Sequence, residues 1–313
     1  MTGVIKRSFA VVVVSAALAA CVGVAGTAGV ASAAPAPAPI MLPPGITLPP
    51  LPAPFDKLFV PYASPQKKLA SSFTPVEKSM RAKYPGQFGV SIVPIGGDTA
   101  WSYGGLKTGR AWSTLKVPVS LAAERKNGAA VAEKEDKAIT FSDNDAAGDL
   151  WGSLGGGRSS VDAVSGVLRE GHDTVTRVSS EIDNPPSYPG YTPWSLADQA
   201  TFGAHLPCLP GSEHVIRLMS SVAPNQQWGI ARVGRDQGAI TAVKGGWGPA
   251  VGADRGMLVR QLGFIGTTKG QVAVSMAAIP RSGKFEDGTA MLNQMGMWLS
   301  RNLVQLPMGR CAG

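Results

Sequence analysis

The chain has few charged residues, few cysteines and few histidines. Only 16% of its 313 residues are charged, against about 25% in an ordinary globular domain. Its three cysteines and three histidines show no zinc-finger, ferredoxin or histidine-rich spacing, so we expect no metal and no cofactor. His172, His205 and His214 have neither an i,i+4 metal pairing nor a nucleophile as partner. We expect them to be ordinary surface or core residues.

The positive charge of the chain is not gathered in a basic run. The 29 Lys and Arg against 21 Asp and Glu give a formal net charge of +8, but no RNA- or DNA-binding signature accompanies it. We therefore expect no nucleic-acid partner. A basic exported monomer, loosely associated with an anionic cell envelope, fits this charge. A hydrophobic fraction of 44% excludes a wholly disordered chain.

Residues 1–33 have the pattern of a cleaved signal peptide. Lys6 and Arg7 precede an apolar stretch over 10–20, and the small residues 31–33 form a cleavage site. We therefore expect a secreted or cell-envelope protein. An alternative is a lipoprotein, because the four residues that end at Cys21 fit a lipobox. The residues after Cys21 stay apolar, which favours simple secretion.

Residues 34–62 are expected to form a linker and residues 63–313 a folded domain. Nine of the 25 prolines lie between Pro35 and Pro54, which excludes a helix or a central strand and favours an extended spacer.

The patterning of the domain alternates between helices and strands and predicts an α+β fold. We expect helices over 73–84, 112–126, 146–154, 159–170, 195–206, 213–221 and 288–304. We expect strands over 88–93, 99–103, 228–233, 240–245, 257–264 and 271–279, and a loop over 183–194. Strands at both ends and helices between them indicate one sheet built from the two termini, with a helical insert.

Cys208 and Cys311 are the cysteines that remain once a signal peptide is removed. Two leftover cysteines in an oxidising compartment most often pair, so we expect a disulfide. It would close a loop of 104 residues, which is worth about 4–5 kcal/mol in chain-entropy models. The alternative is two buried free thiols.

Three short motifs carry the chemistry. Ser113 and Lys116 are three residues apart at a helix start, so their side chains share one face, and a buried neutral lysine can take the proton of a serine. The run Ser142-Asp143-Asn144 supplies a second hydroxyl directly before a helix. The run Lys244-Gly245-Gly246 ends a strand, where a lysine attracts an anionic substrate and glycines admit its backbone. Each motif alone also fits ordinary capping and turn chemistry.

In this order and context the motifs resemble those of the penicillin-recognising serine hydrolases, and most nearly those of class A β-lactamases. The resemblance continues in 145–156, in 192–197 and in 255–263, and so spans about residues 88–304. It implies a β-lactamase-like fold, in which an antiparallel sheet from the N- and C-terminal segments is flanked by helices and joined by a helical subdomain. It also implies a small β-lactam or peptidoglycan-like substrate.

The resemblance assigns catalytic roles residue by residue. Ser113 would be the acylated nucleophile, Lys116 its base, and Ser142 the group that passes a proton to the amide nitrogen of the substrate. The oxyanion hole would combine the Ser113 N–H with an N–H near Gly246 or Trp247. The residues that would bind substrate are Asn144, Lys244, Gly246, Trp247 and Arg255, the last facing the substrate carboxylate.

The sequence departs from the class A pattern at two functional positions. Gly245 stands where the family has Ser or Thr, and the lost hydrogen bond to a charged group is worth about 1.5–3 kcal/mol. Glu181 lies near the expected position of the deacylating glutamate, but Ile182 follows it in place of proline, and Asn184 is three residues on instead of four. We therefore expect slow deacylation.

Two further functions share this fold. A D,D-peptidase or esterase that acts on cell-wall peptides would need no deacylating glutamate. A non-catalytic envelope-binding protein would fit the changes at Gly245 and around Glu181, but it has no use for a buried lysine beside Ser113.

Overall fold

The computed structural model describes residues 40–42, 59–61, 63–251 and 256–312. The chain divides into two units, residues 1–62 and 63–313. In the first unit, β1 (Ile40–Leu42) and β2 (Phe59–Pro61) pair in parallel, so the described part of the expected linker is not a plain extended spacer. The expected signal peptide, the cleavage site and Cys21 lie outside the described residues.

The second unit contains one large sheet and the helices that cover it. Its strands are β3 (Gly86–Pro94), β4 (Trp101–Gly104), β5 (Thr108–Arg110), β6 (Pro193–Ser195), β7 (Ile240–Pro249), β8 (Met257–Thr267) and β9 (Gly270–Pro280). Its helices are α1 (Pro65–Lys83), α2 (Lys116–Asn127), α3 (Ala132–Asp136), α4 (Asn144–Ser153), α5 (Gly157–Glu170), α6 (Leu196–His205), α7 (Glu213–Met219) and α8 (Phe285–Arg301).

The large sheet is antiparallel and joins the two ends of the domain. Its strand order is β4-β3-β9-β8-β7, so the two early strands lie beside the three late ones. The central contact pairs Val90 of β3 with Met276 of β9. The predicted α+β fold, with one sheet from both terminal segments and helices between them, is confirmed.

The two faces of the sheet bury separate apolar cores. Helices α1 and α8 lie along one face, where Phe73, Phe88 and Trp298 pack with their rings 4.9–6.3 Å apart. The helical part, with α2, α4 and α5, lies beyond the other face and shares a core with Leu262 and Phe264. The start of α2 is thereby held against the sheet, which positions the Ser113 motif.

The first helix begins eight residues earlier than the sequence predicts. Ser64 caps it by accepting a hydrogen bond from the Lys67 N–H, and Pro65 occupies the first turn. Pro75 lies inside this helix. An interior proline costs about 3 kcal/mol, and the burial of Leu69 and Phe73 upstream offsets this cost.

The strand expected over 228–233 is wrong, because Gly229–Arg232 is a 3-10 helix. Gly229 has a φ of +60°, which a strand does not accommodate. Its N–H donates to Asn293 Oδ1, and the Ile230 N–H donates to Gln261 Oε1. Side chains therefore satisfy the backbone groups that a neighbouring strand would otherwise bind. The last helix also begins and ends three residues earlier than expected.

The predicted disulfide is present. Cys208, just after α6, is bonded to Cys311. The tail before Cys311 is also held to the sheet, because Gly309 and Gln271 exchange two backbone hydrogen bonds of 2.9 Å. The disulfide thus closes the C-terminal tail onto the helical part.

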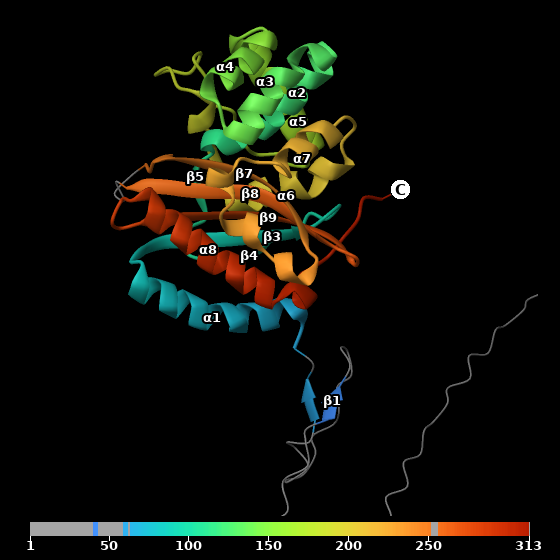
Figure 1. Cartoon of the computed structure of the whole chain (residues 1–313), viewed down its shortest axis with the longest axis vertical. Helices are drawn as coiled ribbons and strands as arrows, with labels where there is room; N and C mark the ends of the chain where they lie inside the picture. Colours follow the sequence, from blue (N-terminus) through green and yellow to red (C-terminus); the bar gives the residue numbers. More distant parts are fainter. Residues whose placement is uncertain (1–39, 43–58, 62, 252–255, 313) are drawn as a thin grey trace, which may run out of the picture. The chain divides into compact units, whose positions relative to one another are not determined.

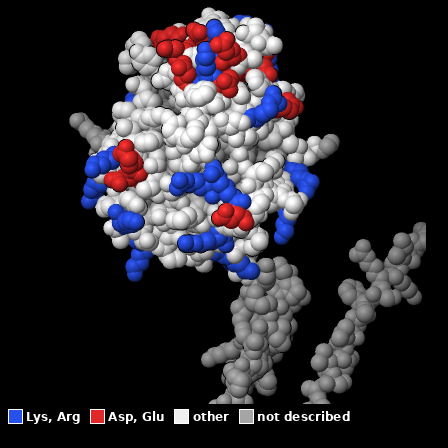
Figure 2. Space-filling view, in the orientation of Figure 1, with Lys and Arg blue, Asp and Glu red and all other residues white. Residues whose placement is uncertain are grey.

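Charge is unevenly distributed over the second unit. On the face shown in Figure 2, acidic side chains gather over the helical end of the molecule, and most of the Lys and Arg lie over the sheet. In the helical part, Lys134 pairs with Asp149 and Lys137 pairs with Glu133. Among the helices that the structure describes, none combines the length and apolar character needed to cross a membrane.

Candidate active site

Ser113 lies in a short 3-10 helix, Trp112–Leu115, that leads directly into α2. Trp112 has a φ of +48°, so the chain turns sharply just before the serine. The first N–H groups of such a helix have no acceptor within it and are free to bind an oxyanion. A Cβ at Gly246 would lie 2.9 Å from the Ser113 nitrogen, so strand β7 contacts this helix start through a glycine.

Lys116 lies one turn after Ser113 and is almost fully buried. Its Nζ donates to Ser142 O at 2.6 Å, Asp143 O at 2.9 Å and Asn144 Oδ1 at 2.8 Å. Burial lowers the pKa of Lys116 to about 8, although the nearby Asp143 acts in the opposite direction. An amine with this pKa is neutral in part of the molecules near neutral pH, and the neutral form can act as a general base for Ser113.

Ser142 lies between two lysines. Its φ of +61° is rare for a non-glycine residue and turns the chain between the preceding helical segment and α4. Lys244 Nζ lies 2.8 Å from Ser142 Oγ, and Lys116 Nζ lies 3.5 Å from the same oxygen. Burial and the charge of Lys116 lower the pKa of Lys244 well below its ordinary value. The three motifs of the sequence therefore meet at one hydroxyl.

The Ser113 hydroxyl forms no hydrogen bond within the described residues, and its side chain is partly exposed. It faces a pocket of about 680 Å³. The predicted site residues that line this pocket are Ser113, Lys116, Ser142, Asn144, Glu181 and Trp247. The partly exposed hydroxyl is thus accessible to a small substrate.

Aromatic side chains that the sequence analysis did not assign form much of the pocket wall. They are Trp112, Trp151, Tyr188 and Tyr191. The rings of Trp112 and Tyr191 meet edge to face at 5.2 Å, and the Arg110 guanidinium stacks 3.9 Å from the Tyr191 ring centroid. The two tyrosines belong to the proline-rich loop over 183–194, whose composition indicated a loop but not its position over the site.

Glu181 lies on the pocket wall with one carboxylate oxygen already engaged. Its Oε1 accepts hydrogen bonds from the Gly157 N–H at 2.7 Å and from Trp151 Nε1 at 3.3 Å. Hydrogen bonds from its own N–H and from the Gly157 N–H lower the pKa of Glu181, so the carboxylate is ionised at neutral pH. A base needs this charge, but the carboxylate also supports the start of α5. Its deacylating role stays a prediction.

Gly245 and Trp247 of β7 pack against different aromatic side chains. A Cβ at Gly245 would lie 2.8 Å from the Trp228 ring, so this indole occupies the space of the side chain that class A enzymes carry there. Trp247 lies two residues further along β7 and is 37% exposed. The centroids of the Trp247 and Phe285 rings are 5.2 Å apart. Arg255 lies outside the described residues, so its expected contact with a substrate carboxylate stays a prediction.

Comparisons with known proteins agree on the fold. No family model matches the chain, and no curated protein matches it significantly. Solved structures do match. A β-lactamase from Xanthomonas campestris is 16% identical with a TM-score of 0.58, over 77% of this chain and 100% of that one. A class A β-lactamase from Mycobacterium abscessus is 16% identical with a TM-score of 0.58, over 74% and 99%. An ancestral class A β-lactamase is 19% identical with a TM-score of 0.56, over 74% and 99%.

The chain therefore has a class A β-lactamase-like fold. The similarity covers nearly the whole of each matched structure and about three quarters of this chain. At this identity it concerns the fold, and the chemistry rests on the residues of the site.

Proposed function

We propose that the protein is an exported active-site-serine hydrolase that opens β-lactam rings slowly, through an acyl-enzyme on Ser113. The observation that carries this proposal is the convergence of Lys116 and Lys244 on Ser142 Oγ beside a pocket that exposes Ser113. The burial of two amines beside one hydroxyl costs free energy of folding, and titratable groups perturbed in this way are typical of catalytic sites.

The first half-reaction uses Ser113, Lys116 and Ser142, which line the same pocket. Neutral Lys116 takes the proton of Ser113 Oγ as this oxygen attacks the amide carbonyl, and backbone N–H groups of Ser113 and of β7 stabilise the oxyanion. The C–N bond then breaks, and Ser142 gives its proton to the leaving nitrogen while it receives the former Ser113 proton from Lys116, whose Nζ lies 3.5 Å from Ser142 Oγ. Lys244 donates to the Ser142 oxygen at 2.8 Å and stabilises the negative charge that develops on it.

The second half-reaction hydrolyses the Ser113 ester with a water that Glu181 deprotonates. The two hydrogen bonds on Oε1 restrain this carboxylate and weaken it as a base. Even a 1 Å error in placement can cost about a hundredfold in rate. Slow deacylation follows from both effects.

The pocket favours a small substrate with apolar groups. Trp112, Trp151, Tyr191 and Trp247 offer ring faces and edges to such groups. An aromatic group of a substrate that packs against one of these rings gains about 0.5–1.5 kcal/mol beyond its buried area. The matched structures are named as β-lactamases, which supports a β-lactam as the first substrate to test.

Hydrolysis of a chromogenic cephalosporin by the purified protein tests the proposal. We expect measurable turnover that Ser113→Ala abolishes and that Ser220→Ala, at an exposed serine at the end of α7, leaves unchanged. Retained activity in Ser113→Ala would show that another group is the nucleophile.

A D,D-peptidase or esterase function is the second candidate, and the engaged Glu181 carboxylate favours it. Such an enzyme forms the same acyl-enzyme and does not need a dedicated base to hydrolyse a β-lactam adduct. Release of the terminal D-alanine from a short peptidoglycan-like peptide, faster than cephalosporin turnover, would favour this function over the first.

A further inference from the structure

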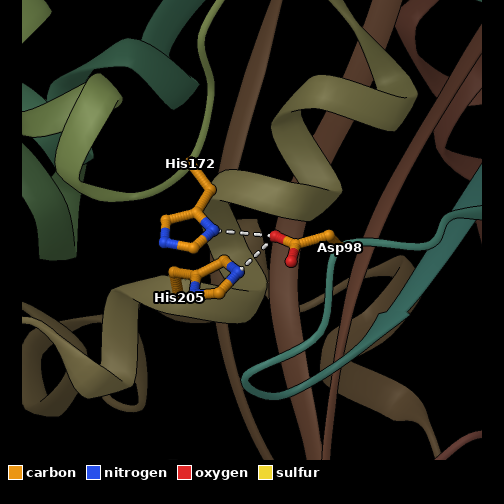
Figure 3. Close-up of side chains that lie close together, drawn as sticks. All are labelled: Asp98, His172 and His205. Atoms are coloured by element: carbon orange, nitrogen blue, oxygen red, sulfur yellow. Dashed lines mark hydrogen bonds and ion pairs between the residues drawn. The ribbon is translucent and has the colours of Figure 1, made fainter.

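Two histidines and one aspartate from three separate segments meet on one oxygen atom. Figure 3 shows His172 and His205 pointing at the Asp98 carboxylate. His172 Nδ1 and His205 Nε2 both lie 2.8 Å from Asp98 Oδ1. The two imidazoles are stacked, with centroids 3.6 Å apart and ring planes 22° apart. The sequence analysis missed this cluster because its members lie 33 to 107 residues apart and share no local pattern.

The surroundings of the cluster hold the histidines more firmly than the aspartate. His205 is the last residue of α6 and is only 11% exposed in its side chain. His172 follows the end of α5 in a left-handed conformation with a φ of +62°. Asp98 lies on the turn between β3 and β4 and is 65% exposed. His205 is therefore the most firmly held of the three, whereas His172 and Asp98, 52% and 65% exposed, have more room to adjust.

The three ligand atoms have the identity and spacing of a transition-metal site. They lie within 4.8 Å of one another. Zinc bonds of about 2.0–2.2 Å place neighbouring ligand atoms roughly 3.3 Å apart in tetrahedral geometry. A small retreat of Asp98 from the present 2.8 Å would reach that spacing. Each histidine would move its proton to the opposite ring nitrogen, so that a lone pair faces the metal.

We propose that Asp98, His172 and His205 bind one divalent transition-metal ion of the Zn²⁺ class, with water completing the coordination. Two imidazoles and one carboxylate suit Zn²⁺ and its neighbours in the first row, whereas Mg²⁺ and Ca²⁺ prefer oxygen ligands. None of the three residues lines the pocket at Ser113, so the site is independent of the proposed hydrolase activity.

The bound ion would act as a structural clamp. It would join the β3–β4 turn to the ends of α5 and α6, where the Gly96 N–H already donates to Ala204 O at 2.9 Å. The disulfide from Cys208 lies three residues beyond His205. Metal binding to the folded state alone stabilises it in proportion to the logarithm of the metal concentration, so heat stability reports on occupancy.

A second cluster of potential metal ligands supplies a matched control for Zn²⁺ binding. Glu124, Glu135 and His214 also bring three potential ligand atoms within 4.8 Å, but they offer one imidazole in place of two. Glu135 is fully buried, and burial and the nearby Glu124 raise its pKa to about 8. Its carboxyl is therefore mostly protonated at neutral pH and a poor metal ligand.

Calorimetric titration of Zn²⁺ into the protein, purified without a polyhistidine tag and freed of metal with a chelator, tests the proposal. We expect one equivalent to bind, and Mg²⁺ to give no heat. His172→Gln and His205→Gln should each weaken Zn²⁺ binding by at least about tenfold, since even partners that only orient a ligand cost 10–100-fold. His214→Gln should bind Zn²⁺ as tightly as the unchanged protein.

Thermal unfolding with and without Zn²⁺ gives a second readout. Zn²⁺ should raise the midpoint of the unchanged protein and of His214→Gln but not that of His172→Gln. Because His172 is half exposed, we expect His172→Gln to fold. This variant therefore tests the metal site even if His205→Gln fails to fold. The proposal is wrong if no saturable Zn²⁺ binding occurs, if both glutamine variants at His172 and His205 bind normally, or if only His214→Gln loses the metal.

Discussion

Lys244 Nζ donates to Ser142 Oγ at 2.8 Å, a bond between residues 102 positions apart in the chain. Strand β7 brings the lysine, and the turn before α4 brings the serine. Lys116 approaches the same oxygen at 3.5 Å. Both lysines have pKa values below their ordinary range, chiefly because of burial. Proton transfer at this hydroxyl is the step that links the geometry to the proposed chemistry.

The pKa of Lys116 predicts a pH dependence of acylation. Below pH 8 the amine is mostly protonated and cannot accept the Ser113 proton. The rate constant should therefore rise about tenfold per pH unit up to about pH 7 and level off above about pH 8. Stopped-flow acylation over this range measures it. Lys137→Met, which removes an exposed lysine paired with Glu133, should leave the profile unchanged. A flat profile would exclude Lys116 as the base.

Glu181→Gln should lengthen the lifetime of the acyl-enzyme without preventing its formation. Glutamine keeps an oxygen that accepts from the Gly157 N–H and Trp151 Nε1, so the loop is preserved while the base is lost. Asp183→Asn is the control, because Asp183 lies on the same loop and accepts only from the Ser180 N–H there. Single-turnover measurement of deacylation distinguishes the variants. An unchanged rate in Glu181→Gln would favour the peptidase function.

Gly245→Thr should destabilise the protein and should not improve β-lactam binding. The added Cβ would lie 2.8 Å from the Trp228 ring, and overpacking of this kind costs about 1–3 kcal/mol. Combination with Trp228→Leu should remove much of that cost. Urea unfolding of the two single variants and the double variant measures the coupling. Additive free-energy changes would show that Trp228 does not exclude a side chain at Gly245.

Replacement of both Cys208 and Cys311 by alanine should lower the free energy of unfolding by about 4–5 kcal/mol, because the bond closes a long loop in the unfolded chain. Urea unfolding measures the difference. Peptide mapping without reductant checks the premise in protein exported to an oxidising compartment. If both cysteines of that protein react with an alkylating agent without reductant, the disulfide is absent.

Much of the fold could be predicted from the sequence because its signals are local. Alternating and β-branched residues marked β3, and apolar runs marked β8 and β9. Polar residues before apolar runs marked α4 and α6. The incorrect predictions concern segments whose conformation depends on contacts with residues far away in the sequence. Apolar packing extends α1 across Pro75, and side chains from Asn293 and Gln261 hold Gly229 and Ile230 in a 3-10 turn.

Only those residues of the candidate site that belong to a sequence motif could be predicted. The order of the three motifs indicated that they meet. The structure brings Lys116 and Lys244 to Ser142 Oγ, and Ser113 lines the same pocket as Ser142. The aromatic wall and the Asp98 cluster have no motif, because the tertiary fold alone brings their members together. The sequence alone showed only that residue 245 lacks a hydroxyl side chain. The structure explains this glycine, because the Trp228 ring occupies the space that a side chain would need.

Intact-mass analysis of the protein after mixing with a penicillin tests the acyl-enzyme on Ser113 most directly. We predict a transient adduct with the added mass of the whole penicillin, present in the unchanged protein, longer-lived in Glu181→Gln and absent in Ser113→Ala. An adduct that persists in Ser113→Ala, or no adduct and no turnover in the unchanged protein, would contradict the proposed mechanism.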